Sequence, residues 1–138
     1  MTDEVTLTKV AVIERCVARA REEYERAGAS FAEDYTRQDA AILNLQRACE
    51  AALDLALHRV RCAGLGLPRT ARDAFALMAE ASLIDRELAL SLQRMVGFRN
   101  LAVHDYQNLQ LEIVEAVLRD RLPDLLTFAR RMLQAPAP

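Results

Sequence analysis

The apolar residues in the first half of the chain recur at spacings of three and four, which is the period of one face of an α-helix. Over residues 8–27 the repeat consists of Val10, Ile13, Val17 and Ala20, with Gly28 placed to end the helix. Over residues 36–63 it consists of Ile42, Leu45, Cys49, Leu53, Leu57 and Val60. This half of the sequence therefore predicts two long amphipathic helices.

Two shorter helices are predicted in the middle of the chain. Thr70 can cap the third helix, and Asp73 then lies in its first turn, where a carboxylate is favourable. The buried face of this helix consists of Phe75, Leu77 and Met78. The fourth helix begins near Asp85, and its apolar face consists of Leu88, Leu92, Met95 and Val96.

The last helical segment begins with Asn108 as its N-cap and is broken or kinked at Pro123, whose ring blocks a helical hydrogen bond. We identify no strand pattern between these segments. Five helical segments with short connections predict an all-α fold, an antiparallel up-down bundle of four to five helices.

The composition also favours helices over sheets. Ala, Leu, Glu, Arg and Gln are good helix formers, whereas four glycines and four prolines are few for a sandwich or barrel. At 138 residues the chain can bury one core but not two independent ones. We therefore expect a single domain over residues 1–134, followed by a disordered tail over residues 135–138.

The charge balance limits the kind of nucleic-acid contact that the chain can make. The formal net charge is −2 and the pI is about 5.7, whereas proteins that wrap nucleic acid carry a strong basic excess. Any nucleic-acid contact must therefore be local. Of the 18 lysines and arginines, Lys9 is the only lysine. Genomic base composition explains this bias toward arginine more simply than phosphate binding does. Because neither a signal segment nor a long apolar run is visible, we expect a cytoplasmic protein that does not enter the membrane.

Three cysteines, Cys16, Cys49 and Cys62, fall within the helical patterns and form no CxxC pair. With only two histidines in the chain, we expect no metal site and no cofactor. The cysteines are expected to be buried free thiols in a reducing compartment.

The two histidines differ in their surroundings. His58 aligns at four-residue steps with Gln46, Glu50 and Asp54, a pattern typical of a solvated or subunit-facing surface. His104 follows Arg99 by five residues, so on a straight helix their side chains diverge by roughly 140°. Convergence of the two would need a turn or a partner subunit near residue 103. From spacing alone, a helix cap, a core imidazole and a packed ring explain Arg99, His104 and Tyr106 better than a catalytic site does.

The sequence over residues 95–106, MVGFRNLAVHDY, resembles the R-x4-H-x-Y signature of HEPN toxins of the HepT family. The Val-Gly-Phe lead-in and the Arg-Asn pair are similar to family members as well. Residues 39–51 are similar to the long second helix of that family, and residues 122–124, Leu-Pro-Asp, to the start of its last helix. The resemblance covers nearly the whole chain, and one departure is Gln107, where members often carry an aromatic residue.

This resemblance implies a HEPN-like bundle that acts as a metal-independent ribonuclease. RNA supplies its own nucleophile, the 2′-hydroxyl, so the enzyme needs proton transfer by His104 and stabilisation of phosphate charge by Arg99. From its position beside Arg99, Asn100 can orient Arg99 or the phosphate, and a structural hydrogen bond to the following loop explains it equally well. Glu50 and Asp54 are candidates to neutralise Arg99 across the bundle in the resting state. HEPN proteins of this kind pair with the motif at the subunit interface, which implies a homodimer.

The resemblance further implies a protein partner, a minimal nucleotidyltransferase antitoxin. That partner would transfer AMP to Tyr106, and the added charge and bulk would block RNA, as in a type VII toxin–antitoxin pair. Without the resemblance, Tyr106 is a packed ring with its hydroxyl at the rim. The alternative function is a non-catalytic helical binding partner of a nucleotidyltransferase. An intact set of Arg99, His104 and Tyr106 favours the ribonuclease, because an adaptor does not need all three.

Overall fold

The computed structural model describes residues 3–135, which form six α-helices and two short 3-10 helices and contain no strand. In chain order these elements are α1 (Glu4–Ala27), η1 (Gly28–Ser30), α2 (Tyr35–Cys62), α3 (Asp73–Glu80), α4 (Arg86–His104), η2 (Tyr106–Asn108), α5 (Leu111–Asp120) and α6 (Leu122–Gln134). The predicted all-α fold is confirmed, with six helices instead of four to five. Of the predicted tail, residues 136–138 lie outside the described part, and the division into a domain and a tail stays a prediction.

Helix α1 begins at Glu4, before the predicted start near residue 8, whereas α2 begins within one residue of its predicted start. The Asp3 carboxylate accepts a hydrogen bond of 2.7 Å from the backbone N–H of Thr6 and caps α1. The Asp34 carboxylate accepts one of 3.1 Å from the N–H of Arg37 and caps α2. Side-chain acceptors at the N-cap satisfy N–H groups that the first turn leaves unpaired, so each helix extends back to its aspartate.

Two predicted caps are wrong, one of them at α3. The Asp73 carboxylate accepts hydrogen bonds from the backbone N–H groups of Arg69 (2.9 Å) and Thr70 (3.1 Å). Thr70 therefore belongs to the turn that Asp73 holds, and Arg72 occupies the N-cap position without a side-chain hydrogen bond.

The second wrong cap is Asn108. Its side-chain amide donates to the carboxylate of Asp105, and α5 begins after Gln110 instead. The predicted break at Pro123 is confirmed, since α5 ends at Asp120 and the proline stands in the first turn of α6. A proline at this position loses no helical hydrogen bond.

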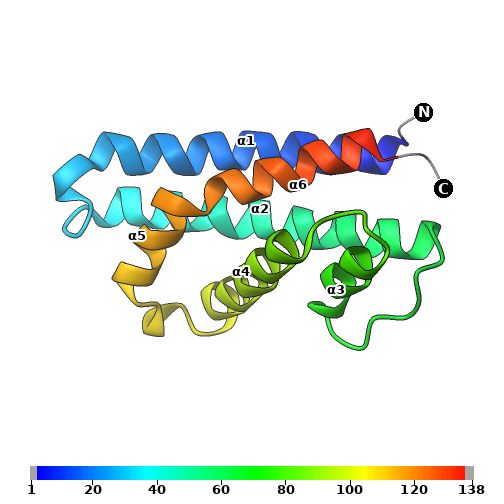
Figure 1. Ribbon diagram of the computed structural model, residues 1–138. Coiled ribbons are helices and arrows are strands. Elements are labelled where there is room, and N and C mark those ends of the chain that lie inside the picture. The colour runs from blue at the N-terminus through cyan, green and yellow to red at the C-terminus, as the bar shows by residue number, and fades with distance from the viewer. Residues whose placement is uncertain (1–2, 136–138) are drawn as a thin grey trace.

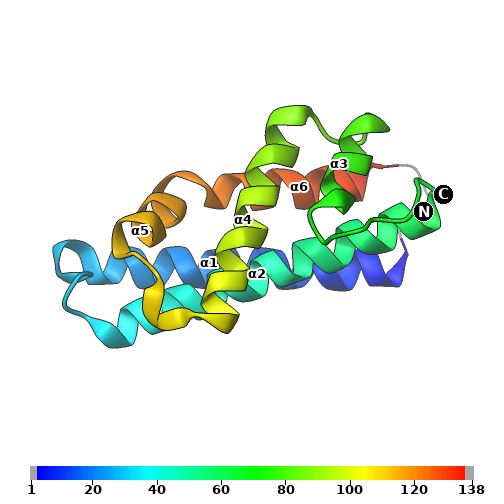
Figure 2. The same cartoon turned by 90° about the horizontal axis from the view of Figure 1, so that it is seen from below.

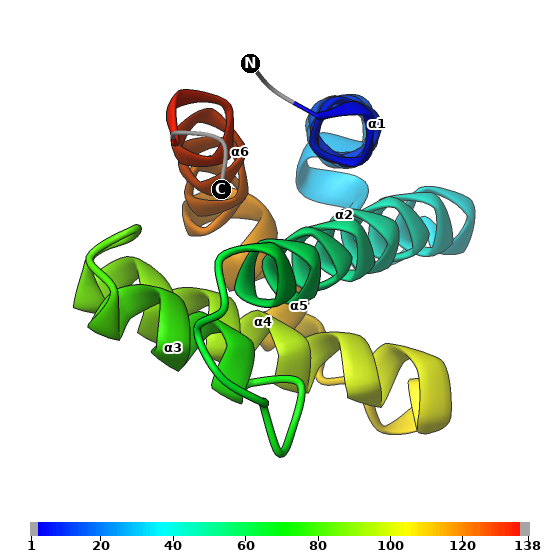
Figure 3. The same ribbon diagram turned by 90° about the vertical axis from the view of Figure 1, so that its right-hand side faces the viewer.

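The long helices α1 and α2 run antiparallel, and α6 lies along them, so that both ends of the described chain meet at one end of the molecule (Figure 1). Viewed end-on, α2 lies between α1 and α6 on one side and α3 and α4 on the other (Figure 3). Helix α4 crosses α2 obliquely, and its C-terminal end lies beside the first part of α2 (Figure 2). This crossing positions the predicted motif.

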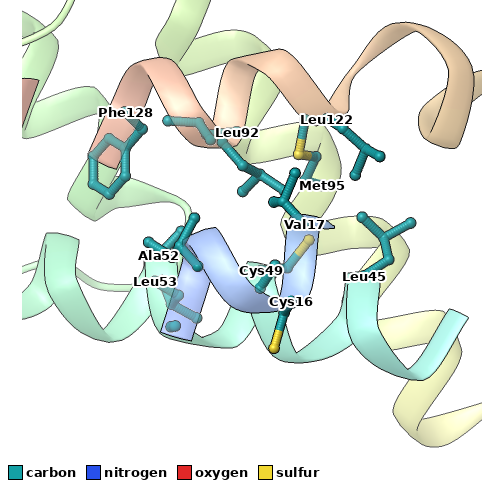
Figure 4. Close-up of a cluster of buried hydrophobic side chains, with 14 of the residues drawn as sticks. Cys16, Val17, Leu45, Cys49, Ala52, Leu53, Leu92, Met95, Leu122 and Phe128 are labelled. Carbon is teal, nitrogen blue, oxygen red and sulfur yellow. The ribbon is translucent and has the colours of Figure 1, made fainter. Parts of the chain in front are cut away.

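The core is formed where α1, α2, α4 and α6 meet (Figure 4). Its fully enclosed side chains include Val17, Leu45, Leu92, Leu122 and Phe128. Burial of one such side chain contributes about 1.5–3 kcal/mol, so this cluster fixes how α4 is rotated against α2. None of the helices in residues 3–135 combines the length and apolar character that crossing a membrane requires.

The cysteines follow the prediction in two of three cases. Cys16 and Cys49 are buried free thiols in the core, and burial raises the pKa of the Cys49 thiol to about 12. Cys62 is exposed, contrary to the prediction, because it lies in the last turn of α2.

Candidate active site

The motif residues lie at the C-terminal end of α4 and in η2. Helix α4 is capped by Asp85, as predicted, and continues without interruption to His104. Its buried side chains Met95, Phe98 and Ala102 face the core, which fixes the directions of the residues between them. The chain leaves the helix at Asp105 and enters η2.

Arg99 points toward α2 and meets a carboxylate there. Its Nε lies 3.3 Å from Oε1 of Glu50, and its Nη1 donates a 2.9 Å hydrogen bond to Oδ1 of Asn100. Gln46 donates a 3.2 Å hydrogen bond to the same Glu50 oxygen. The expected neutralisation of Arg99 across the bundle is therefore made by Glu50, whereas Asp54 pairs with Lys9 at 2.9 Å.

His104 is exposed in the last turn of α4. Because α4 does not turn at Val103, the side chains of Arg99 and His104 diverge as a straight helix requires. No hydrogen bond or ion pair within residues 3–135 joins them. A single chain thus presents the guanidinium and the imidazole on different sides of one helix end.

Tyr106 is held against α2 by its hydroxyl group. The hydroxyl donates a hydrogen bond to Oδ1 of Asp39, although 45% of the residue is exposed to solvent. Partial burial, then this hydrogen bond and the negative charge of Asp39, raise the pKa of Tyr106 to about 12. A buried or hydrogen-bonded phenol loses its proton less readily when a carboxylate is its acceptor.

Asp39 is absent from the residues predicted for the site. It lies 67 residues from Tyr106 in the sequence, and no helical spacing relates positions so far apart. Its acidic side chain one turn into α2 gave no signal beyond that of an ordinary solvated residue.

His58 belongs to the end of the molecule where α1 begins. Its Nε2 lies 3.2 Å from Oδ2 of Asp3, and only 13% of the His58 side chain is exposed. The backbone N–H of Thr6 and then His58 lower the pKa of Asp3 to about 2. His58 therefore makes an intramolecular contact, while the Asp54 side chain on the same polar face is 53% exposed, and a subunit-facing role of this face stays a prediction.

A groove of about 640 Å³ lies between α4 and α5. Phe98, Leu101 and Ile113 are among its lining residues, while Arg99, His104 and Tyr106 are not. Among the residues that the structure describes, no three His, Cys, Asp or Glu side chains gather closely enough to hold a metal ion.

Comparison with known families identifies the chain. Residues 13–132 match the family model described as "Ribonuclease HepT-like". The chain belongs to the HepT-like ribonuclease family. The mRNA nuclease HepT of Shewanella oneidensis is 45% identical to this HepT-like chain over 126 residues, which are 91% of this chain and 94% of the relative.

Solved structures of HepT-like toxins are similar over the same length. The tri-AMPylated Shewanella oneidensis HEPN toxin in complex with MNT antitoxin shares 42% identity and a TM-score of 0.91, covering 97% of this chain and 100% of that one. A toxin–antitoxin with AMP-PNP shares 42% identity and a TM-score of 0.91, with 96% and 100% coverage.

These matches confirm three predictions from the sequence: the family, the HEPN-like fold and the enzyme class, a ribonuclease. The relatives also carry the function that was predicted, since one is an mRNA nuclease and one is an AMPylated toxin bound to an MNT antitoxin. The individual site residues of this chain stay predictions.

Proposed function

We propose that this chain is the toxin of a type VII toxin–antitoxin pair in the cytoplasm. It cleaves RNA without a metal ion through Arg99 and His104, and a minimal nucleotidyltransferase antitoxin silences it by transferring AMP to Tyr106. The observation that carries the proposal is the 45% identity, over nearly the whole chain, to an mRNA nuclease. The clustering of the motif at one end of α4 supports it.

The chemistry needs only the groups that the motif supplies. The 2′-oxygen of RNA attacks the neighbouring phosphorus, the 2′-O–P bond forms, and the bond from phosphorus to the 5′-oxygen breaks. His104, being exposed, can exchange a proton with the 2′-hydroxyl or the leaving oxygen. Arg99 offsets the charge that develops on the phosphate oxygens, and its hydrogen bond to Asn100 helps to orient it.

The proposed active form is a homodimer. Within one chain Arg99 and His104 point in different directions, so one chain does not assemble both groups around a phosphate. A two-fold axis near the end of α4 would bring His104 of one subunit toward Arg99 of the other. Leu101 and Val103, which are 45% and 41% exposed, offer apolar surface at that end of the helix.

Modification of Tyr106 explains neutralisation in physical terms. Its hydroxyl lies near the exposed end of α4, where the proposed RNA site is. Each AMP unit adds a negative phosphate and an adenosine, which repel and obstruct the RNA backbone. One similar protein of known structure is a tri-AMPylated HEPN toxin in complex with MNT antitoxin.

Induced alone, this chain should arrest bacterial growth, and purified protein should cleave RNA in the presence of a chelator. Arg99→Ala and His104→Ala should lower cleavage by at least about 100-fold, because each removes a charge or proton-transfer group from the transition state. Arg130→Ala, which removes an exposed arginine of α6, is the matched control and should keep the parent activity.

The same experiment separates the alternative function. If the chain were a non-catalytic binding partner of a nucleotidyltransferase, the parent protein would not cleave RNA. The Arg99→Ala and His104→Ala variants would then behave like the parent. Equal toxicity of the parent and the two variants would contradict the assignment of Arg99 and His104.

A further inference from the structure

The Asp39 carboxylate has one side-chain partner among residues 3–135, the hydroxyl group of Tyr106. It takes part in no ion pair in that part of the chain. Asp34 already caps α2, so the fold does not need Asp39 for that purpose. The contact between the exposed Asp39 carboxylate and the Tyr106 hydroxyl, the expected AMP acceptor, therefore points to a chemical role for Asp39.

We propose that Asp39 is the general base for AMP transfer to Tyr106. This inference rests on the proposed function, in which Tyr106 is the acceptor. The tyrosyl oxygen attacks the α-phosphorus of ATP, the O–P bond to AMP forms, and the bond from the α-phosphorus to pyrophosphate breaks. The phenolic proton passes to the Asp39 carboxylate and from there to solvent.

The need for a base follows from the acidity of the acceptor. Because the pKa of Tyr106 is about 12, roughly one molecule in 100,000 carries the phenolate at neutral pH. Attack by the neutral hydroxyl therefore requires proton removal as the O–P bond forms. A general base must lie within hydrogen-bond reach of the proton that it takes, and Asp39 already accepts that proton's hydrogen bond.

The arrangement also orients the nucleophile. The hydrogen bond ties η2, which carries Tyr106, to α2, the longest helix of the described chain. Tyr106 remains 45% exposed while its hydroxyl is held by Asp39, so the antitoxin can approach the residue with ATP. The toxin would thus contribute a catalytic carboxylate to its own modification.

The test follows the first AMP addition by intact-protein mass, with the chain, its nucleotidyltransferase antitoxin and Mg-ATP. Asp39→Asn should lower kcat for this first addition by about 100-fold or more and leave KM for the toxin within a few-fold. Asp54→Asn makes the same change in an exposed carboxylate of α2 that pairs with Lys9, and it should be modified at the parent rate.

A second variant distinguishes a base from a structural contact. In Asp39→Ala protein, added formate should restore part of the lost rate, because a small carboxylate can occupy the vacated position and accept the proton. Parent-like kcat in Asp39→Asn, a change confined to KM, or no rescue of Asp39→Ala by formate would each overturn the role of Asp39.

Failure of the proposed function has a separate signature. If Tyr106→Phe protein still gains AMP, the acceptor lies elsewhere, whatever Asp39 does. If the parent is modified on Tyr106 and the Asp39 variants are modified equally fast, the acceptor is right and the base is wrong.

Discussion

Glu50 limits how much of the Arg99 charge is available to a phosphate. The two side chains are 3.3 Å apart, and 29% of Arg99 and 36% of Glu50 are exposed to solvent. An ion pair that is partly solvated in this way contributes about 0–1 kcal/mol. RNA can therefore displace Glu50 from Arg99, but it must compete with it.

Glu50→Gln should strengthen RNA binding by about two- to fivefold, since the competing charge is removed while the side-chain volume is kept. Binding is measured by fluorescence anisotropy in a His104→Ala background, which prevents cleavage. Asp54→Asn serves as the control, because Asp54 pairs with Lys9 and not with Arg99. Weaker binding by Glu50→Gln would show that Glu50 orients Arg99 for the phosphate.

The acidity of Tyr106 tests its contact with Asp39 directly. The ultraviolet titration of the parent minus that of Tyr106→Phe should give a pKa of about 12. Asp39→Asn should lower this pKa toward the ordinary value of about 10, because it removes a negative charge that disfavours the phenolate. An unchanged pKa would mean that the hydroxyl does not face Asp39 in solution.

Single residues differ in how far the sequence could predict them. Glu50 was a candidate to neutralise Arg99 across the bundle, and the structure places the two side chains 3.3 Å apart. The Tyr106–Asp39 contact could not be predicted, since it depends on the angle at which α4 crosses α2. That angle is set by packing of the core, which no local spacing reveals.

At the level of elements, α4 determines what one chain can and cannot assemble. The helix continues past residue 99 to His104, because its buried residues Phe98 and Ala102 keep it against the core. Gly97 lies in the same helix, and the Cβ of an alanine there would come within 2.6 Å of Nη2 of Arg72. The nearest atom is the end of a flexible, exposed side chain that can move.

Gly97→Ala should therefore stabilise the protein by about 0.5–1 kcal/mol, the advantage of alanine over glycine inside a helix. Thermal unfolding should show a melting temperature higher by a few degrees. Gly28→Ala should do the opposite, because Gly28 has a φ of 54° that alanine adopts only with strain. A lower melting temperature for Gly97→Ala would show that Arg72 cannot give way.

Helix boundaries show where sequence patterns suffice. The start of α4 at Asp85 was predictable, because the capping residue directly precedes the apolar repeat. The start of α2 after Asp34 agrees with the prediction to within one residue, whereas the apolar repeat that begins at Val10 placed the start of α1 too late. Asp73 lies in the first turn of α3 as predicted, but Thr70 does not cap the helix, because it lies in the preceding turn and its backbone N–H donates to Asp73.

At the scale of the whole molecule, the proposal depends on pairing of two chains. The net charge of −2 offers no general attraction to RNA, so the site must concentrate charge locally. Pairing of two chains at the C-terminal end of α4 would place two copies of Arg99 and two copies of His104 around one cleft between the subunits. Each composite site would then take Arg99 from one subunit and His104 from the other.

Mixing two inactive variants tests this central claim most directly. Arg99→Ala and His104→Ala subunits are unfolded together, refolded at equal concentration and assayed for RNA cleavage. A composite site predicts recovery of roughly one quarter of the parent activity, because half of the dimers are mixed and each mixed dimer keeps one of its two sites. No activity above that of the separate variants, in a mixture shown to contain mixed dimers, would contradict the account.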